Sequence, residues 1–266
     1  MSEQNPLIVE REGHVLRLTL NRPERRNAIT DELCLRLSDA ILAAEDDTGI
    51  RCIVVTGSGD KAYCAGADLT PGDTPFKVDF NKIGTAYATL LRTTKASRLP
   101  MIARVNGVCM AGGMGILSMC DIAVAVTEAR FGLPEVKIGL FPLQVAVLLQ
   151  SILGPRRMAE MCITGQPISA QQALEYGLLN AVVPRDDLDS CVNTYVNAVI
   201  AAAPGAVRRG KYMLRRMEEM NFEQAMTFAE TAITPMILAD EAREGLAAFN
   251  ERRAPSWINM NHKEAK

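Results

Sequence analysis

Apolar and polar residues alternate from residue 14 to residue 20, the first regular pattern along the chain. Leu16, Leu18 and Leu20 share one face, and the residues between them share the other. This alternation predicts a half-buried strand. A continuous apolar run at 50–56 predicts a buried strand, and two more strands are predicted at 101–105 and 122–126.

Helical spacing begins after Thr30, whose side chain can cap a helix. Apolar residues recur from there at intervals of three or four, as far as Ala44. A second helix is predicted at 80–96, and a short small-residue helix follows the strand at 101–105. Ser169 is a further N-cap candidate, and Gly177 lies where a left-handed C-cap would end that helix.

Beyond about residue 140 helical spacing dominates, and only 178–183 still resembles a strand. Helices are predicted at 187–202, 206–220, 222–233 and 239–252, with Pro204 and Pro235 as breaks. The order of strands and helices indicates the α/β fold class. We divide the chain into a core, 1–195, and a helical region, 196–266. Because no low-complexity linker joins them, we expect the two parts to pack as one unit.

Composition narrows the function classes. The 266 residues carry 29 Lys and Arg against 31 Asp and Glu, a net charge of -2, so a nucleic-acid partner is not expected. No apolar stretch is long enough to cross a membrane, and the N-terminus has no secretion signal. Seven Cys without a Cys-x-x-Cys spacing predict reduced, buried thiols in a cytoplasmic protein.

The usual catalytic residue types are scarce. Only His14 and His262 are present, which disfavours a histidine triad, and no metal site is predicted. Two turns rich in small residues each follow the end of a predicted strand. They are AYCAGADL, 62–69, and NGVCMAGGMG, 106–115. Their backbone N–H groups could converge on one oxygen as an oxyanion hole. Equally, the small residues could simply permit tight strand-to-helix packing.

A third segment, FGLPEVKIGLFP at 131–142, holds an acid between apolar neighbours. Pro134 restricts the backbone that leads to Glu135. A buried Glu135 would have a raised pKa and could exchange protons near neutral pH, whereas a solvated loop glutamate would not. Asp121 follows Met119-Cys120, and we interpret it as a structural, hydrogen-bonded acid rather than a catalyst.

In this order and at this spacing, the three segments resemble the crotonase superfamily of enoyl-CoA hydratases and isomerases. The resemblance covers nearly the whole chain, from LNRPERRNAI (20–29) through TGQPISAQQALEYGLLNAVVP (164–184) to AFNERRAPSW (248–257). It implies a crotonase-like spiral of repeated β-β-α units, with a C-terminal helical region that forms a homotrimer or homohexamer.

The same resemblance implies the site. The backbone N–H groups of Ala67 and Gly112 would bind the carbonyl oxygen of an acyl-CoA thioester, which gains charge in an enolate-like transition state. Glu135 would be the catalytic acid or base. No separate cofactor is implied, since coenzyme A is part of the substrate. Five residues match substrate-binding positions: Arg26, Ala65, Asp68, Leu69 and Arg252. Asp68 could instead cap the following segment, both arginines could be solvated charges, and Arg252 could come from a neighbouring subunit.

One departure from the family pattern bears on the reaction. Typical hydratases of this family place a second glutamate where this chain has Gly115, so only Glu135 remains to hold and activate water. We place hydration of a 2-enoyl-CoA first, with Gln144 or a backbone group helping to hold the water. A single-acid enoyl-CoA isomerase and a weakly catalytic CoA-thioester-binding protein are the alternatives. The acyl-pocket wall is expected at 70–88, where no motif indicates the chain length.

Overall fold

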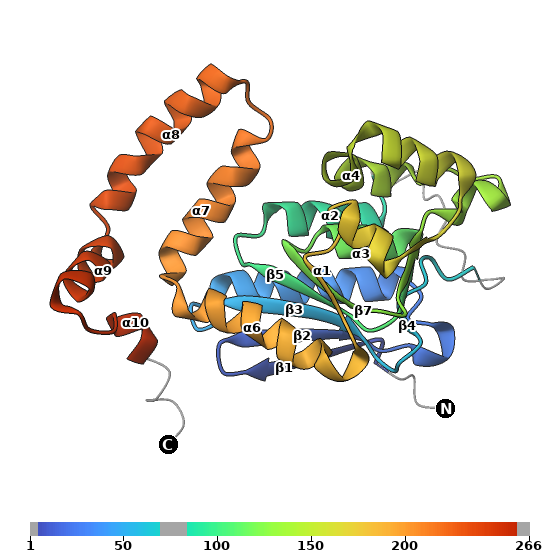
Figure 1. Ribbon diagram of the computed structural model, residues 1–266, viewed down its shortest axis with the longest axis horizontal. Coiled ribbons are helices and arrows are strands. Elements are labelled where there is room, and N and C mark those ends of the chain that lie inside the picture. Colours follow the sequence, from blue (N-terminus) through green and yellow to red (C-terminus); the bar gives the residue numbers. More distant parts are fainter. Residues whose placement is uncertain (1–4, 70–83, 260–266) are drawn as a thin grey trace.

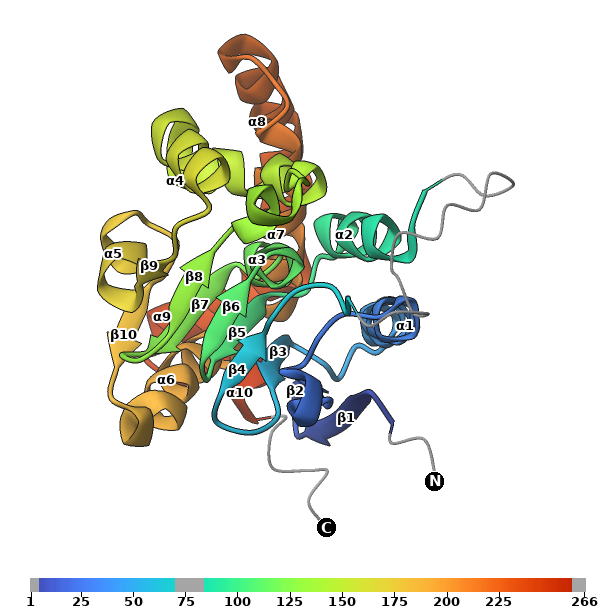
Figure 2. The same cartoon turned by 90° about the vertical axis from the view of Figure 1, so that its right-hand side faces the viewer.

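A computed structural model describes residues 5–69 and 84–259. Its first sheet has six strands in the order β1-β2-β3-β5-β7-β10 (Figures 1 and 2). All neighbours are parallel except β1 and β2. The strands are β1 (Leu7–Glu12), β2 (Val15–Leu20), β3 (Cys52–Gly57), β5 (Met101–Val105), β7 (Ile122–Val126) and β10 (Ala181–Val183).

A second sheet lies beside the first, in the order β4-β6-β8-β9 (Figure 2). Its members are β4 (Ala62–Cys64), β6 (Val108–Met110), β8 (Arg130–Gly132) and β9 (Ile168–Ser169). The chain places one strand in each sheet and then forms a helix, three times in succession. These helices are α2 (Ala86–Ala96), α3 (Gly112–Ser118) and α4 (Leu143–Thr164), the last preceded by the 3-10 turn η2 (Pro134–Ile138). The repeated β-β-α units expected from the resemblance are therefore present.

Local signals explain several helix ends. The Thr30 hydroxyl accepts a hydrogen bond from Leu33 N at 3.2 Å and begins α1 (Asp31–Asp46), as predicted. Ser169 begins α5 (Ala170–Glu175) through a reciprocal capping box with Gln172. Gly177 follows α5 with φ +78°, the left-handed conformation expected of it.

Among the differences from the prediction, three concern a sheet edge, a helix start and a proline. β1 was not expected, because its alternation is weak. α2 begins at Ala86 rather than at residue 80, and 80–83 lie outside the described residues. Pro235 does not break α8 (Phe222–Ile237) but lies two residues before its end. Since α8 has no buried residue, the carbonyl that loses its donor to Pro235 can bond water instead.

The C-terminal helices fall into two groups: α6 packs on the core, and α8 and α9 form a projecting arm. α6 (Leu188–Ala201) buries Leu188, Val192 and Val196 against the first sheet. α7 (Pro204–Met217) leads away to α8 and α9 (Asp240–Glu251), which project beyond the sheets, and the short helix α10 (Ser256–Asn259) follows them (Figure 1). α8 has no buried residue, whereas α7 bonds to the core through Lys211. The expectation that both parts pack as one unit stays a prediction. The division after residue 195 lies within α6 and stays a prediction.

Basic side chains fasten α7 to the core. Lys211 Nζ donates to Asp121 Oδ2 at 2.6 Å and to Leu99 O at 2.5 Å, and Arg215 donates to the other Asp121 oxygen at 3.1 Å. Met101 N also donates to Asp121, at 2.8 Å. Asp121 is thus a hydrogen-bonded structural acid, as predicted. Burial lowers the pKa of Lys211, and Asp121 opposes that shift.

Replacing Asp121 with Asn is expected to destabilise the fold. The buried Lys211 ammonium and the Arg215 guanidinium would lose their shared counter-charge, at a cost of about 2–3 kcal/mol in the free energy of unfolding. Urea titration followed by circular dichroism measures the loss. Asp240→Asn is the matched control, since its partner is an exposed Arg243 and its effect should stay within about 0.5 kcal/mol. Equal effects of the two variants would contradict the structural role of Asp121.

All seven cysteines are free thiols, and five of them are buried, in agreement with the prediction of reduced thiols. Within the described residues, no helix combines the length and the apolar character that a membrane span requires. The described residues also contain no group of three or more His, Cys, Asp or Glu arranged to hold a metal ion.

Candidate active site

The first small-residue turn leaves β4 and is held by backbone hydrogen bonds to the segment before α1. Ile29 N donates to Gly66 O at 2.8 Å, and Asp68 N donates to Ile29 O at 2.9 Å. These bonds make an isolated parallel bridge between Ile29 and Ala67. Because they use the groups on either side of Ala67, the N–H of Ala67 itself points away from Ile29.

The second turn leads from β6 into α3. Ala111 has φ +50° and ψ -126°, a conformation that favours glycine, and its N–H donates to Gly132 O at 2.9 Å. Gly112 is the first residue of α3, so the helix offers its N–H no acceptor. The strained residue thus turns the chain immediately before a free backbone donor.

The two turns pack directly on each other at Gly66. A Cβ at this position would lie 2.7 Å from Ala111 Cβ, 3.1 Å from Met110 O and 3.3 Å from Gly112 N. Gly66 has φ +95° as well, so it meets both a steric and a conformational requirement for glycine. The structure thereby brings Ala67 and Gly112 together, from segments about 45 residues apart in the sequence. The tight packing of the turns is therefore present, and their action as an oxyanion hole stays a prediction.

Glu135 lies in η2, three residues beyond the Gly132 carbonyl that accepts from Ala111. Its Oε2 is buried and has no hydrogen-bond partner within the described part of the chain. Burial raises the pKa of Glu135, although a hydrogen bond to its own backbone opposes the shift. The buried carboxyl oxygen agrees with the first of the two interpretations of this acid, and its exchange of protons stays a prediction.

A tyrosine that no motif identified lies between these parts. Tyr87, on α2, donates its hydroxyl proton to Gly112 O at 2.7 Å. A Cβ added to Gly115 would overlap the Tyr87 hydroxyl oxygen and lie 3.0 Å from its Cζ. Gly115 is the position at which the chain lacks the second glutamate of the family pattern. The space next to it is therefore filled by a phenol from a different helix.

The predicted substrate-binding residues are only partly gathered. Ala65 N donates to Arg26 O at 3.0 Å, which places Arg26 beside the first turn with its side chain exposed. Leu69 is also exposed. Asp68 is buried, and its Oδ2 accepts from Arg22 at 2.7 Å, so its side chain belongs to an ion pair. A role of these residues in substrate binding stays a prediction.

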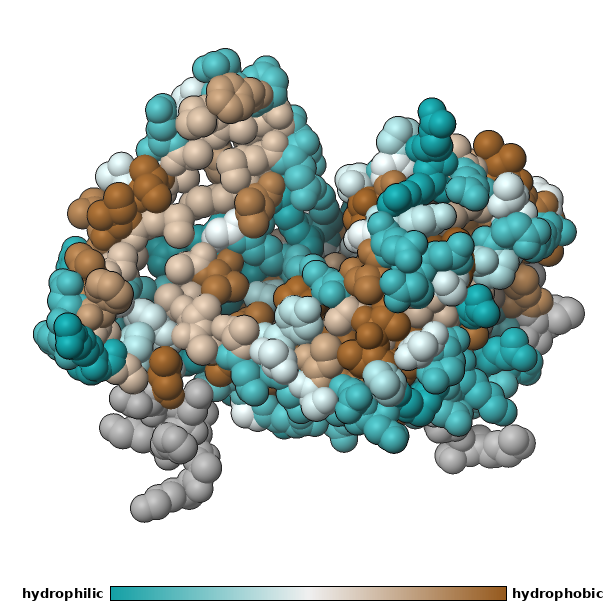
Figure 3. All heavy atoms as spheres, viewed as in Figure 1, coloured by the Kyte–Doolittle hydropathy of each residue, from teal (hydrophilic) through white to brown (hydrophobic). Residues whose placement is uncertain are grey.

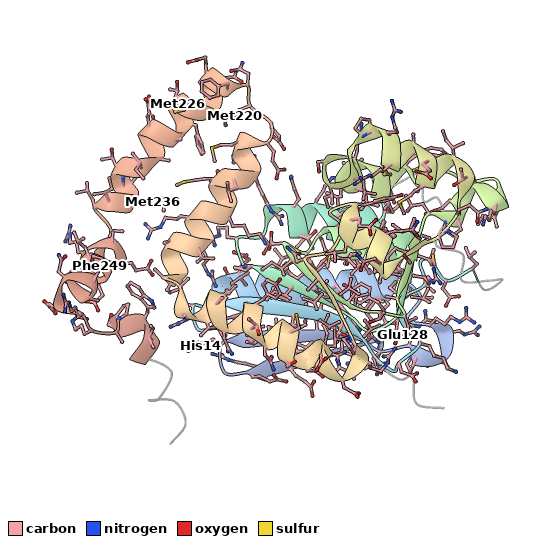
Figure 4. All side chains as sticks on the ribbon, in the orientation of Figure 1. His14, Glu128, Met220, Met226, Met236 and Phe249 are labelled. Carbon is pink, nitrogen blue, oxygen red and sulfur yellow. The ribbon has the colours of Figure 1, made fainter. Side chains whose placement is uncertain are left out.

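The candidate Arg252 and the disfavoured His14 lie elsewhere. Arg252 caps α9 with φ +54°, on the arm that projects away from β4 and α3 (Figure 1). Within one chain it does not meet the two turns. His14, labelled in Figure 4, has a structural contact: its Nδ1 donates to Gly49 O at 2.6 Å.

Gln144, the predicted water-holding residue, has a different partner. Its side chain is exposed and donates to Thr85 Oγ1 at 3.3 Å. The next residue, Val145, is the one that faces Gly115: its Cγ2 would lie 3.6 Å from a Cβ added there. A role of Gln144 in holding water stays a prediction.

A cavity of about 620 Å³ opens between α7 and the α3–α4 side of the core. Its lining includes Asp121 and Lys211 but neither Glu135 nor Gly112. The cavity is therefore not the chemical site.

Sequence reasoning missed Tyr87 and Arg22. Arg22 lies in the matched LNRPERRNAI segment, but nothing in that segment pairs it with an acid 46 positions later. Tyr87 lies at the edge of the region expected to wall the acyl pocket, most of which, 70–83, is outside the described residues. No local signal could have found either contact.

Comparison with known proteins agrees with this geometry. The family described as enoyl-CoA hydratase/isomerase matches residues 10–260. A short-chain-enoyl-CoA hydratase of Clostridium acetobutylicum is 31% identical over 252 residues, covering 94% of this chain and 97% of its own length. A carnitinyl-CoA dehydratase of Salmonella typhi is 34% identical over 265 residues, with 97% and 99% coverage.

Solved structures give the same result for the fold. An enoyl-CoA hydratase of Mycobacterium smegmatis superimposes with a TM-score of 0.90 at 33% identity, over 96% of this chain and all of that one. An enoyl-CoA hydratase of Bacillus anthracis reaches a TM-score of 0.87 at 29% identity, with 95% and 98% coverage. The predicted fold class, a spiral of β-β-α units followed by helices, is confirmed.

Proposed function

The chain belongs to the enoyl-CoA hydratase/isomerase family, and from that premise we propose that it adds water to the double bond of a 2-enoyl-CoA thioester. One observation carries the proposal: a buried, unpartnered Glu135 carboxyl oxygen next to two packed turns with free backbone N–H groups, all within the described residues. The relatives named above as hydratases support the same reaction class.

The two turns would act on the thioester carbonyl. Its oxygen would accept from the N–H groups of Ala67 and Gly112. When water attacks C3, the π electrons move toward C1 and this oxygen gains negative charge, which the donors stabilise more than they stabilise the neutral carbonyl. One such donor is worth about 3 kcal/mol in transition-state stabilisation. Rigid packing at Gly66 supports this role, because preformed donors need no reorganisation during the reaction.

Glu135 would move the proton. As a carboxylate it takes one proton from the attacking water, whose oxygen bonds to C3. The resulting carboxylic acid then delivers that proton to C2, and the enolate returns to a thioester. One water is consumed, and Glu135 ends as it began. No separate cofactor enters this scheme, and coenzyme A would be held by Arg26, Ala65, Asp68 and Leu69, with Arg252 supplied by another subunit.

A single-acid enoyl-CoA isomerase is the second candidate, favoured by Gly115. Glu135 would remove a proton from one carbon and return it two positions away, which requires no held water. Incubation with crotonyl-CoA and with 3-hexenoyl-CoA, analysed by mass spectrometry and chromatography, separates the two. A mass gain of one water supports the hydratase, and a positional shift without mass change supports the isomerase. Binding of both thioesters without turnover would contradict both proposals.

The pH dependence provides a further prediction. Burial raises the pKa of Glu135, and the carboxylate is the active base, so activity is present above that pKa and is lost as the pH falls through it. We expect the acidic limb of kcat/KM for crotonyl-CoA hydration to lie above the usual glutamate range. Circular dichroism over the same range checks that the fold persists. A limb at the ordinary glutamate pKa would contradict a buried catalytic acid.

The proposal extends to assembly and location. Apolar side chains on the α8–α9 arm are exposed, among them Phe222, Ile237 and Phe249. Figure 3 shows apolar residues gathered on this arm, and Phe249 is labelled in Figure 4. In a homotrimer, or in a homohexamer of two trimers, other copies of the chain would cover them. Sedimentation velocity measures this oligomeric state, and a monomer at micromolar concentration would contradict it.

Seven free thiols support a reducing, cytoplasmic location.

A further inference from the structure

We propose that Tyr87 supplies the water contact that the second glutamate provides in paired-acid hydratases, its hydroxyl oxygen accepting a hydrogen bond from the water that Glu135 deprotonates. This inference rests on the proposed hydration. It assigns the contact to α2, an element outside the family motifs, and it makes Tyr87 a catalytic residue in contact with the reacting water.

The first support is steric. The Tyr87 hydroxyl oxygen occupies the space into which a Cβ at Gly115 would project, and its Cζ lies 3.0 Å from that Cβ position. A carboxylate at residue 115 and the Tyr87 ring therefore exclude each other. Where the family pattern has an acid, this chain has a polar oxygen in the volume next to the same backbone position.

The second support is the hydrogen-bonding capacity of the hydroxyl. A phenol has one proton to donate, and Tyr87 donates it to Gly112 O at 2.7 Å. Its oxygen lone pairs remain available as acceptors. Burial raises the pKa of Tyr87 well above its usual value, so the group stays a neutral phenol whose proton is held by Gly112. A water can therefore approach it only as a donor.

The third support is its position relative to Glu135. Tyr87 bonds to Gly112 O, and the preceding residue, Ala111, donates its N–H to Gly132 O at 2.9 Å, three residues before Glu135. The buried Glu135 Oε2 has no protein partner among the described residues. A water that donates one O–H to Tyr87 and the other to Glu135 would satisfy both acceptors. Gln144, the alternative considered from the sequence, is exposed and bonded to Thr85.

The step balances with a single acid. Glu135 removes one proton from the water. The water oxygen then bonds to C3, and the C2–C3 π electrons shift toward the thioester carbonyl. Glu135 then protonates C2. Tyr87 stays neutral and accepts a hydrogen bond from the water while Glu135 removes the other water proton. Tyr87 itself transfers no proton. Its effect is to orient the water oxygen toward C3.

Tyr87→Phe tests this role, because it keeps the ring and removes only the hydroxyl. We expect kcat for crotonyl-CoA hydration to fall roughly 10- to 100-fold. A second reaction serves as the internal control: exchange of the α-protons of butyryl-CoA in heavy water needs Glu135 and the oxyanion donors but no held water. That exchange should change by less than about 3-fold. Tyr176→Phe, a half-buried tyrosine that packs on Arg157, is the matched control variant and should alter neither reaction.

The hydration and exchange rates together distinguish a role of Tyr87 in holding water from a role in positioning Gly112. Equal losses of hydration and exchange would overturn the inference, since Tyr87 would then act only by placing Gly112. Unchanged hydration would overturn it too, because the water would be held elsewhere. If the unaltered chain exchanges α-protons but hydrates no 2-enoyl-CoA, the proposed hydratase function itself fails.

A paired variant tests the shared space without relying on loss of activity. Gly115→Glu alone should abolish hydration, since the new side chain overlaps Tyr87. Combining it with Tyr87→Ala should recover hydration to at least about 10-fold above either single variant, because the acid then has room and replaces the phenol as the second water contact. Strictly additive losses in the double variant would contradict the exchange of Tyr87 for the acid.

Discussion

Replacing Glu135 with Gln should lower kcat for crotonyl-CoA hydration by about 10³-fold. The amide keeps the size of the side chain but cannot accept a proton from water, and general acid–base catalysis by one positioned group contributes roughly 10²- to 10⁴-fold. The scheme passes the same proton through Glu135 twice, so no other described residue near the turns can replace it. Steady-state kinetics measured under saturating substrate report the loss directly.

Glu160→Gln is the matched control for this prediction. Its side chain is exposed on α4, so the same chemical change should leave kcat within about 2-fold of the starting value. KM should also change little in Glu135→Gln if the oxyanion donors remain in place. Retention of more than a tenth of the activity in Glu135→Gln would contradict the single-acid mechanism.

Gly66→Ala should have the second-largest effect, a loss of about 10²-fold in kcat/KM. The added methyl would meet Ala111 Cβ at 2.7 Å and press on the backbone that leads to Gly112 N. The two turns would have to separate, and moving one donor by about 1 Å can cost 10²-fold in rate. The α-proton exchange of butyryl-CoA should fall in parallel, because both reactions depend on the same donors.

A second glycine-to-alanine variant, Gly177→Ala, distinguishes the effect of this steric contact from the effect of backbone strain. Gly177 has φ +78°, similar to Gly66, but no heavy atom lies within 4 Å of its added Cβ. Gly177→Ala should therefore reduce stability by about 1 kcal/mol without changing kcat/KM. Thermal unfolding and kinetics of the two variants provide the comparison. Similar kinetics in both variants would show that the packing of the turns does not position the donors.

Local patterns determined much of the secondary structure. The caps at Thr30 and Ser169, the strands at 101–105 and 122–126 and most of the C-terminal helices follow from spacing and from side chains that bond nearby backbone. The prediction for Pro235 was wrong because the effect of a proline depends on exposure. Near the end of a solvent-exposed helix, the backbone carbonyl that lacks a donor can bond water, whereas a buried carbonyl could not.

The ordered motifs also determined the family, and they indicated Glu135 as the proposed catalytic acid. Three short segments at fixed spacing identified both turns and Glu135, and the resemblance implied that Gly115 stands where a second glutamate is typical. They could not show whether Glu135 was buried, because its neighbours in the sequence are compatible with either a solvated or a packed loop. Its burial depends on how η2 packs beside β8 and α4, which is a tertiary arrangement.

The chain by itself thus determined which elements form and which family they build, because those signals are local or recur in a fixed order. Tertiary structure alone decided what stands beside Gly115 and how the arm is held. Tyr87 meets residue 115, Arg22 meets Asp68 and Lys211 meets Asp121 across 28, 46 and 90 positions. Such contacts depend on how separate helices and strands are oriented against one another, and hydrophobic periodicity carries no information about that orientation.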